Sequence, residues 1–473
     1  MKQIDRREFL KRFGAAAAVV GASAALESCT GGAGSKVAAD AMLGSATSGE
    51  KPIGEMTYRL NQNGEKVSLL GYGMMRLPIV PGGSTRPDGN DIDQERVNEL
   101  VDYAIAHGVN YFDTSPAYCK GHSEEATGIA LHRHPRESYY VATKLSNFAP
   151  QTWSREASQQ MFRNSLKFLQ VDYVDYLLLH AIGQGGMDNF NSRYMNNGIL
   201  DWLVEQKEKG LIRNLGFSFH GDVEVFDTML EWMDDGKYHW DFVQIQMNYV
   251  DWKHAKEQNR RNVNAEYLYG ELAKRNIPAI IMEPLLGGRL TKMPVHIVNN
   301  LHQRDSRGSV ASWAFRFCGT YPGVLTALSG MTYMEHLQDN LRTFCPLEPL
   351  TDDDLAYLEE IAQLYLKYPI VPCNDCKYCM PCPYGLDIPG ILLHYNKMVN
   401  EGTVPNNMQD PEYQRLRKQY LISYDRAVPS VRQADHCISC GMCRPHCPQN
   451  IRIPYELHRI AERVEELRRN VLQ

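Results

Sequence analysis

Eight of the twelve cysteines in this 473-residue chain stand in two short runs near its C-terminal end. Within each run the first three cysteines recur every third residue, and the fourth, three or four residues farther on, precedes a proline. Three thiolates spaced in this way can surround one face of an iron–sulfur cubane, and the cysteine before the proline ligates the other cluster where two are present. The spacing therefore assigns Cys373, Cys376, Cys379 and Cys447 to one 4Fe–4S cluster, and Cys437, Cys440, Cys443 and Cys382 to a second.

Zinc sites and disulfides are the alternatives for these cysteines. Zinc would need two CxxC pairs for each ion, and it leaves the threefold spacing and both prolines unexplained. Disulfides fail on geometry, since cysteines three residues apart in crowded runs pair poorly. The first run departs slightly from the commoner pattern, with two residues instead of three before Cys382. Outside the runs, Cys119 is expected to be a small filler, and Cys318 and Cys345 to be buried thiols.

The two runs are separated by 54 residues, far more than in a minimal two-cluster module. Two helix-like segments, 388–398 and 411–424, lie in this insert, and a charged amphipathic helix is predicted over 454–470. A helix with a capping box is predicted to begin at Thr351. The segment 346–473 therefore resembles the helical dicluster domain of fumarate reductase iron–sulfur subunits.

Residues 52–345 favour a closed (β/α)8 barrel. Asn63-Gly64 predicts a hairpin, and eight β-rich runs then alternate with helical patterns. No G-x-G-x-x-G follows the first run, which argues against a dinucleotide-binding open sheet. The eight runs are Val67–Gly71, Tyr111–Thr114, Tyr139–Leu145, Val174–His180, Leu215–Ser218, Val243–Asn248, Ala279–Pro284 and Leu325–Gly330.

Asp113, Lys144, His180 and Ser218 fall at or near the ends of predicted strands, where a barrel of this type performs its chemistry. These residues belong to an ordered set of motifs with which the chain resembles the aldo-keto reductase family over the whole barrel. The motifs are Asp113–Tyr118, Gly121–Glu125, Thr143-Lys144, Leu178–His180, Leu215–Ser218, Val243-Gln244 and Glu283–Leu285.

Four of these residues suit carbonyl reduction. The phenol of Tyr118 has an ordinary pKa of about 10, and an ammonium from Lys144 within ~4–6 Å would lower it. Asp113 would pair with Lys144, and His180 would donate to a carbonyl oxygen of the substrate. The expected reaction takes a hydride from a nicotinamide and a proton from Tyr118.

The resemblance also implies a nucleotide site, made by Ser218, Gln244, Pro284, Leu285, Gly330 and Asn340. Ser218 and Gln244 would hold the carboxamide, the loop 329–340 the adenosine phosphates, and Asn340 the adenine. Gly330 and His336 stand where the best-studied relatives carry Lys and Arg, and Met282 stands where an aromatic ring usually stacks on the nicotinamide. In those relatives the Lys and Arg bind the 2′-phosphate that distinguishes NADP from NAD. Because this sequence lacks both cations, the choice between NAD and NADP stays open.

The first 28 residues are predicted to be a Tat signal, with Arg6-Arg7 ahead of a mild apolar stretch over 13–26. Cys29 follows in a lipobox-like sequence, so we expect export to the periplasm, with contact to the membrane only through a lipid on Cys29. Residues 29–51 are Gly, Ala and Ser rich and predict a flexible tether. Tat carries folded cargo, which suits clusters assembled before export.

The net charge of −6 argues against nucleic-acid binding. The leading hypothesis is an exported oxidoreductase acting on a small carbonyl or alcohol, with two 4Fe–4S clusters, NAD(P), and a redox partner protein. The alternatives are an electron-transfer protein whose barrel is a docking scaffold, or a reductase whose clusters are structural. The long loops 81–93 and 183–197 carry no charge cluster that would identify the substrate.

Overall fold

A two-stranded hairpin precedes the main sheet, formed by β1 (Tyr58–Leu60) and β2 (Lys66–Ser68). The computed structural model describes residues 52–83 and 91–471. The predicted signal 1–28 and tether 29–51 lie outside the described residues. The hairpin at Asn63-Gly64 is confirmed, with Gly64 at a φ of +77°. The side-chain oxygen of Asn61 closes the turn by accepting from the N–H groups of Asn63 and Glu65.

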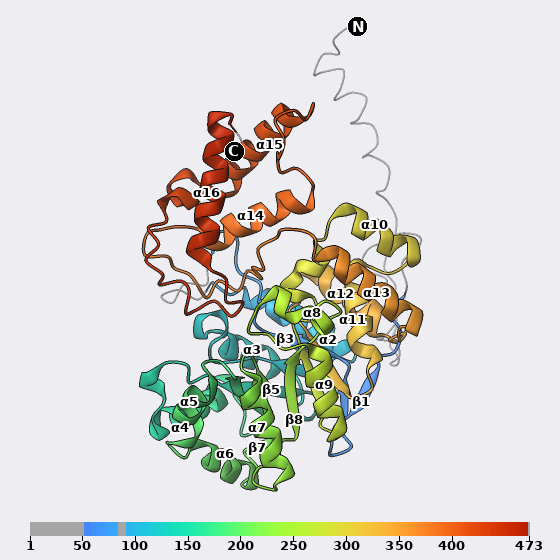
Figure 1. Cartoon of the computed structure of the whole chain (residues 1–473). Helices are drawn as coiled ribbons and strands as arrows, with labels where there is room; N and C mark the ends of the chain where they lie inside the picture. Colours follow the sequence, from blue (N-terminus) through green and yellow to red (C-terminus); the bar gives the residue numbers. More distant parts are fainter. Residues whose placement is uncertain (1–51, 84–90, 472–473) are drawn as a thin grey trace, which may run out of the picture. The chain divides into compact units, whose positions relative to one another are not determined.

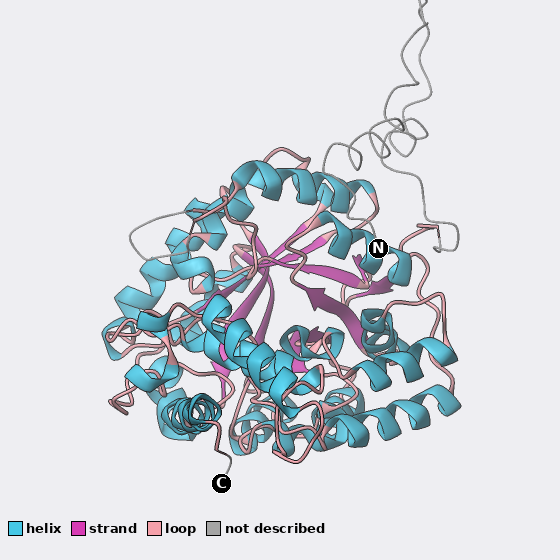
Figure 2. Ribbon diagram, turned by 90° about the horizontal axis from the view of Figure 1, so that it is seen from above, coloured by secondary structure: helices cyan, strands magenta, loops and turns pink. Residues whose placement is uncertain are grey.

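Eight parallel strands then close into a barrel, because β10 pairs with both β9 and β3. Figure 2 shows the strands converging at the centre of a ring of helices. The predicted (β/α)8 fold is confirmed. The strands are β3 (Leu70–Gly73), β4 (Tyr111–Asp113), β5 (Tyr140–Leu145), β6 (Val174–Ile182), β7 (Ile212–Phe219), β8 (Phe242–Gln246), β9 (Ala279–Met282) and β10 (Val324–Ser329).

The predicted first strand, Val67–Gly71, was wrong in its bounds. The chain changes partners at Leu69, whose N–H donates to Thr57 on the hairpin side and whose carbonyl accepts from Ala327 in the barrel. One apolar run therefore supplies the end of a hairpin strand and the start of a barrel strand. Hydrophobicity alone does not mark the change of partner.

Helices surround the barrel (Figure 1). The predicted apolar face of the first is confirmed, since Val97, Leu100, Val101 and Ala104 are buried. The helices are α2 (Gln94–Ala106), α3 (Ser123–Leu131), α4 (Arg155–Leu169), α5 (Gly186–Phe190), α6 (Ile199–Glu208), α7 (Val223–Asp234), α8 (Asp251–Gln258), α9 (Ala265–Lys274), α10 (Val295–Arg304), α11 (Val310–Thr320), α12 (Met334–Phe344) and α13 (Asp352–Tyr365). Short turns of helix occur at Tyr118–Gly121, Arg136–Ser138, Pro150–Thr152, Asn191–Met195 and Leu286–Thr291.

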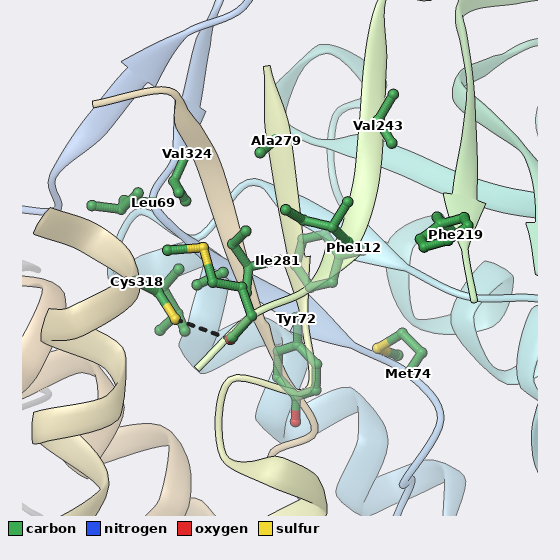
Figure 3. Packing of buried hydrophobic residues seen from close by; sticks show 14 of the residues in the cluster. Leu69, Tyr72, Met74, Phe112, Phe219, Val243, Ala279, Ile281, Cys318 and Val324 are labelled. Carbon is green, nitrogen blue, oxygen red and sulfur yellow. Dashed lines mark hydrogen bonds between the residues drawn. The ribbon is translucent and has the colours of Figure 1, made fainter. Parts of the chain in front are cut away.

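The barrel core contains side chains from strands far apart in the sequence (Figure 3). Tyr72 of β3 stacks on Phe112 of β4 with their ring centres 5.9 Å apart. Cys318 and Cys345 are fully buried thiols outside any disulfide, as predicted, and the Cys318 sulfur donates to the Met247 carbonyl at 3.4 Å. The core is therefore continuous from the sheet to the helices outside it.

Helix α13 packs against the barrel. It begins with the predicted capping box of Thr351 and Asp354, and it buries Leu358, Ile361 and Tyr365 in the same core as the strands. The chain thus adds one more helix to the barrel before the first cysteine run begins.

The C-terminal module is helical, as predicted, and has a hydrophobic core of its own. Helices α14 (Ile388–Asn400), α15 (Tyr413–Ala427) and α16 (Ile453–Arg469) pack together around residues such as Ile391, Tyr420 and Ile460. Short helical turns at Ser430–Arg432 and Ala434–His436 lead into the second cysteine run. Among the helices described over 52–83 and 91–471, none combines the length and apolar character needed to span a bilayer.

Candidate active site and iron–sulfur module

The ends of β4 and β5 bring Asp113 and Lys144 into a buried ion pair. The Lys144 Nζ lies 2.5 Å from the Asp113 Oδ1 and also donates to the Thr114 carbonyl at 2.8 Å. The other carboxylate oxygen of Asp113 accepts from the Gln244 Nε2 at 3.3 Å. Burial raises the pKa of Asp113 and lowers the pKa of Lys144, and the attraction between the two charges opposes both shifts.

Tyr118 lies directly beside this pair, with the Lys144 Nζ 4.9 Å from the centre of its ring. The sequence led us to expect that Lys144 lowers the pKa of this phenol. In the structure, burial and then the charge of Asp113 raise the pKa of Tyr118 well above its usual value. Because the Lys144 charge is compensated at 2.5 Å, little of it remains to stabilise a phenolate. Tyr118 therefore holds its proton at neutral pH.

The turn after Tyr118 is strained. Cys119 and Lys120 adopt left-handed backbone angles, with φ values of +46° and +54°. Such angles in residues other than glycine cost on the order of 1 kcal/mol each and persist where the surroundings impose them. Here the Cys119 sulfur donates to the Met75 carbonyl at 3.4 Å, which ties the turn to the loop after β3. The strained turn therefore holds in place the short helical segment Tyr118–Gly121, which begins with Tyr118.

His180 lies on β6 and is held from its Nδ1 side. The Ser146 Oγ is 2.6 Å from this nitrogen and the Ser115 Oγ is 3.4 Å from it. The ring packs edge-on to Tyr118, with ring centres 6.0 Å apart, and 4.8 Å from the ring of Phe148. Burial, reinforced by nearby positive charge, lowers the pKa of His180 well below its usual value, so the imidazole is neutral.

Three residues at this site were missed by the sequence analysis. Ser146 and Phe148 follow β5 directly, and their place after a predicted strand end was a usable signal. Arg193 lies in the Asn191–Met195 turn and donates to the His180 carbonyl at 2.6 Å. No local pattern around Arg193 indicates this role, because its partners come from β6 and from the loop after β5.

Three of the residues predicted to bind nucleotide form side-chain hydrogen bonds with other residues of the chain. The Ser218 hydroxyl accepts from the Ala181 N–H at 2.9 Å, Gln244 donates to Asp113, and the Asn340 Nδ2 donates to the Ser329 Oγ at 2.9 Å. All three side chains are buried. Pro284 and Leu285 follow β9 and Gly330 follows β10, as the motif positions require. Asn374 of the first cysteine run donates to Glu283 at 3.2 Å, directly beside Pro284.

A cavity of about 1610 Å³ opens beside His180. Its lining includes Ala117 and Phe148 from the barrel, and Cys376, Cys440 and Cys447 from the C-terminal module. None of the six residues predicted to bind nucleotide, all of them described in the structure, lines this cavity. The cavity therefore joins the Tyr118 neighbourhood to the cluster cysteines, and the predicted nucleotide contacts lie outside it.

The cysteines group across the two runs. Burial, with repulsion from other groups that include Cys447, raises the pKa of Cys373 to about 11 and that of Cys376 to about 12. Burial, with repulsion from Cys437, Cys440 and Cys382, raises the pKa of Cys443 to about 11. The electrostatic neighbours of each run thus include the proline-preceding cysteine of the other.

Two sets of four thiols are the donor chemistry that 4Fe–4S clusters require. A cavity of about 220 Å³ is lined by all four cysteines of the second set, Cys382, Cys437, Cys440 and Cys443. Over residues 52–83 and 91–471, no group of three or more His, Cys, Asp or Glu side chains gathers as a single metal ion requires. The cysteines present fit 4Fe–4S clusters.

Two family models match the chain. The model described as the aldo/keto reductase family matches residues 69–363, and the 4Fe-4S dicluster domain model matches residues 372–453. The chain is 34% identical over 325 residues to L-galactose dehydrogenase of Arabidopsis thaliana, covering 64% of this chain and 93% of that protein. It is 25% identical over 334 residues to NADH-specific methylglyoxal reductase of Escherichia coli, covering 63% and 95%.

Among solved structures, the fold is similar to the holo form of an aldo-keto reductase from Bacillus halodurans. The TM-score is 0.50 at 20% identity, over 65% of this chain and 96% of that one. The match covers the barrel part of the chain and shows the shared fold.

In the crossed assignment, each cluster is held by three cysteines of one run and the last cysteine of the other run. This assignment predicts which substitutions disturb the same cluster. Cys376→Ser and Cys447→Ser should alter one of two EPR signals of the reduced holoprotein, and Cys440→Ser and Cys382→Ser should alter the other. Cys119→Ser, outside both runs, should leave both signals unchanged. If Cys447→Ser instead alters the signal that Cys440→Ser alters, each run holds its own cluster and the crossed assignment is wrong.

Proposed function

This chain belongs to the aldo/keto reductase family and is an oxidoreductase, and we propose that it interconverts an alcohol and a carbonyl group at Tyr118 with electrons exchanged through two 4Fe–4S clusters. The observation that carries the proposal is the cavity that His180 shares with Cys376 and Cys447. A barrel serving only as a docking scaffold would have no use for a buried Asp–Lys pair beside a tyrosine and a histidine.

Proton movement at this site follows from the pKa shifts. The raised pKa of Tyr118 keeps the phenol protonated, which is the form that donates to a carbonyl oxygen during reduction. Lys144, 4.9 Å from the centre of the ring, offers the phenolate that remains only the part of its charge that Asp113 does not compensate. In the oxidation direction the same phenolate takes the proton back from the alcohol.

His180 acts as a neutral hydrogen-bond donor. With the Ser146 hydroxyl donating to the Nδ1, the proton of the neutral ring would lie on the Nε2, from which it can be donated to the substrate oxygen. Arg193 holds the backbone of His180 through its carbonyl, and Phe148 packs on the ring. The substrate oxygen would thus receive one donor from Tyr118 and one from His180, an arrangement that polarises a carbonyl.

The cluster residues are Cys373, Cys376, Cys379 and Cys447 for one cluster, and Cys437, Cys440, Cys443 and Cys382 for the other. Oxidation of an alcohol to a carbonyl releases two electrons and two protons. When bound, the two clusters would each take one electron, the hydroxyl proton would pass to Tyr118, and the proton from the broken C–H bond would leave to solvent. The chain places Cys376 and Cys447, two ligands of the first cluster, in the lining of the same cavity as His180.

The substrate class follows from the relatives. L-galactose dehydrogenase and methylglyoxal reductase are named for a sugar and a small dicarbonyl compound. We take small hydroxylated aldehydes and sugars as the substrate class, and ferricyanide serves as an artificial electron acceptor that bypasses the natural partner protein.

Tyr118→Phe removes the donated proton and should lower kcat for sugar oxidation by at least ~100-fold, the usual contribution of a positioned general acid–base. The measurement is anaerobic ferricyanide reduction by the holoprotein with L-galactose and D-arabinose, and with the anionic sugars D-galacturonate and D-galactose 6-phosphate. Tyr173→Phe, a substitution of the same kind on the outer part of the barrel, is the control and should leave kcat unchanged. Equal rates for wild type and Tyr118→Phe, or no turnover of any of these compounds by the wild type, would contradict the proposal.

Export is the second part of the proposed function, supported by Arg6-Arg7 and Cys29. Replacing both arginines by lysine keeps the charge and should retain the protein in the cytoplasmic fraction of the producing bacterium, because Tat recognition requires the arginine pair. Cys29→Ser should release the exported protein from the membrane fraction. Lys11→Arg is the control. An unchanged distribution after the double lysine substitution would refute export by this route.

A further inference from the structure

Asn374 connects the first cysteine run to the barrel at the predicted nucleotide site. Its Nδ2 donates to the Glu283 Oε1 at 3.2 Å, at the end of β9. A Cβ added to Gly287, in the next turn of that loop, would lie 2.1 Å from the Asn374 Cβ. The segment therefore rests on the backbone of the loop after β9.

Arg76 extends this contact across the two neighbouring strands. It follows β3, and its side chain covers Gly330 at the end of β10, where an added Cβ would lie 3.3 Å from it. Its guanidinium donates to the Asn374 carbonyl, and its own carbonyl accepts from the Thr332 Oγ1 at 2.8 Å. Since β9, β10 and β3 are adjacent in the barrel, Asn374 and Arg76 together bridge all three strand ends.

These three strand ends are where the family resemblance puts the dinucleotide. The predicted contacts Pro284, Leu285 and Gly330 lie in the loops that Asn374 and Arg76 cover. Ser218, Gln244 and Asn340 are turned inward and hydrogen-bonded within the chain. A dinucleotide and the segment Cys373–Cys379 would have to occupy the same surface.

We infer that Cys373–Cys379 takes the place of the nicotinamide dinucleotide, so that the holoprotein binds no NAD(P) at the mouth of its barrel. The cluster-binding loop is thus seated where relatives of this fold class would hold their soluble cofactor. This inference goes beyond the proposed function, because neither of its tests depends on turnover.

The first test is nucleotide binding. Anaerobically purified holoprotein should show no saturable binding of NADPH or NADH in equilibrium dialysis at concentrations up to ~1 mM, the upper end of ordinary KM values. Nucleotide co-purifying with the protein, or saturable binding of either compound in the micromolar range, would overturn the inference.

The second test uses two adjacent glycines. Gly287 and Gly288 both have left-handed backbone angles, with φ values of +68° and +88°, so alanine strains both positions. Only at Gly287 does the new methyl group meet Asn374, since nothing lies within 4 Å of a Cβ at Gly288.

Gly287→Ala should therefore displace the cysteine segment and speed iron release to a chelator by about tenfold relative to Gly288→Ala, equivalent to about 1.4 kcal/mol. It should also change the EPR signal of the cluster assigned to Cys373, Cys376, Cys379 and Cys447. Equal iron release and equal spectra in the two variants would show that Asn374 is not seated on Gly287 and would overturn the inference.

A different observation concerns the charge of the cavity beside His180. Its lining has four more basic than acidic residues, although the whole chain is acidic. Only Asp222 and Asp375 oppose them. The basic residues are Arg76, Lys120, Arg193, Arg261, Lys377 and Arg444. For all of these except Lys120, no described carboxylate lies within 4.0 Å of the charged nitrogens.

Arg193 is the most informative of these residues, because only 2% of it is exposed. Its guanidinium donates to the His180 carbonyl, the Asn147 Oδ1 and the Tyr194 hydroxyl. These acceptors satisfy its hydrogen bonds without cancelling its charge. A buried charge that is not compensated is costly, and an anion in the adjoining cavity would compensate it.

We propose, on the basis of the proposed function, that the substrate carries a carboxylate or phosphate group held by Arg261 and drawn toward Arg193. Both groups are oxyanions that a guanidinium binds through paired hydrogen bonds. The reacting carbonyl or alcohol would lie at His180, with the anionic group farther along the cavity.

Thermal shifts of the holoprotein test this proposal without turnover. D-galacturonate and D-galactose 6-phosphate should each be compared with neutral D-galactose, and at least one should raise Tm more than the neutral sugar does. Arg261→Gln should abolish most of the added shift. Arg260→Gln is the matched control, since the neighbouring arginine does not line the cavity. The anion that gives the larger shift identifies which oxyanion the site prefers.

Two outcomes would overturn the proposal. One is an equal Tm shift for the charged and the neutral sugars. The other is a change in the cluster reduction potential in Arg261→Gln with no change in anion binding, which would show that the cations serve only to balance the clusters. If Tyr118→Phe abolishes turnover while anion binding is absent, the proposed function stands and the substrate class alone is wrong.

Discussion

The buried pairing of Asp113 with Lys144 is the interaction on which the active site depends. Either charge alone in this core would be severely penalised, and losing one partner of such a pair typically costs about 3–5 kcal/mol. The pair joins β4 to β5, receives a third contact from Gln244 on β8, and lies against the Tyr118 ring. Its mutual compensation also explains why Tyr118 remains a protonated phenol instead of becoming a preformed phenolate. The electrostatics of the site thus follow from an ion pair that is nearly neutral as a unit.

The second constraint is the seating of a cluster-binding loop on the barrel. Asn374 and Arg76 join the first cysteine run to the ends of β9, β10 and β3, and the cavity beside His180 continues to Cys376, Cys440 and Cys447. A barrel that in related proteins works with a diffusible cofactor is here connected to a redox module of the same chain. The inferred absence of NAD(P) would suit the proposed export, because free nicotinamide is scarce outside the cytoplasm. The proposed export signal, the predicted clusters and the covered nucleotide surface are consistent with one another.

Much of the fold was predictable because its signals are local. Alternating β-rich and helical segments indicated the eight-stranded barrel, Asn63-Gly64 indicated the hairpin, and the threefold cysteine spacing indicated the clusters. The bounds of β3 were wrong because the partner exchange at Leu69 leaves no mark in the hydrophobic pattern. Arg193 and Asn374 were missed for a similar reason, since each acts through residues distant in the chain. The pKa of Tyr118 was predicted in the wrong direction because burial and the proximity of Asp113 are properties of the packed site.

The sequence by itself determined the chemical inventory: which residue types are available, how the cysteines are spaced, and which segments alternate as strands and helices. Those features depend on periodicity and on short-range geometry, which a linear pattern records. Only the tertiary structure decided which of these residues contact one another. It compensated Lys144 with Asp113, turned Ser218, Gln244 and Asn340 inward, and brought Asn374 onto the loop after β9. These outcomes depend on distances between residues that are remote along the chain, and such distances are set when the barrel closes and the module packs against it.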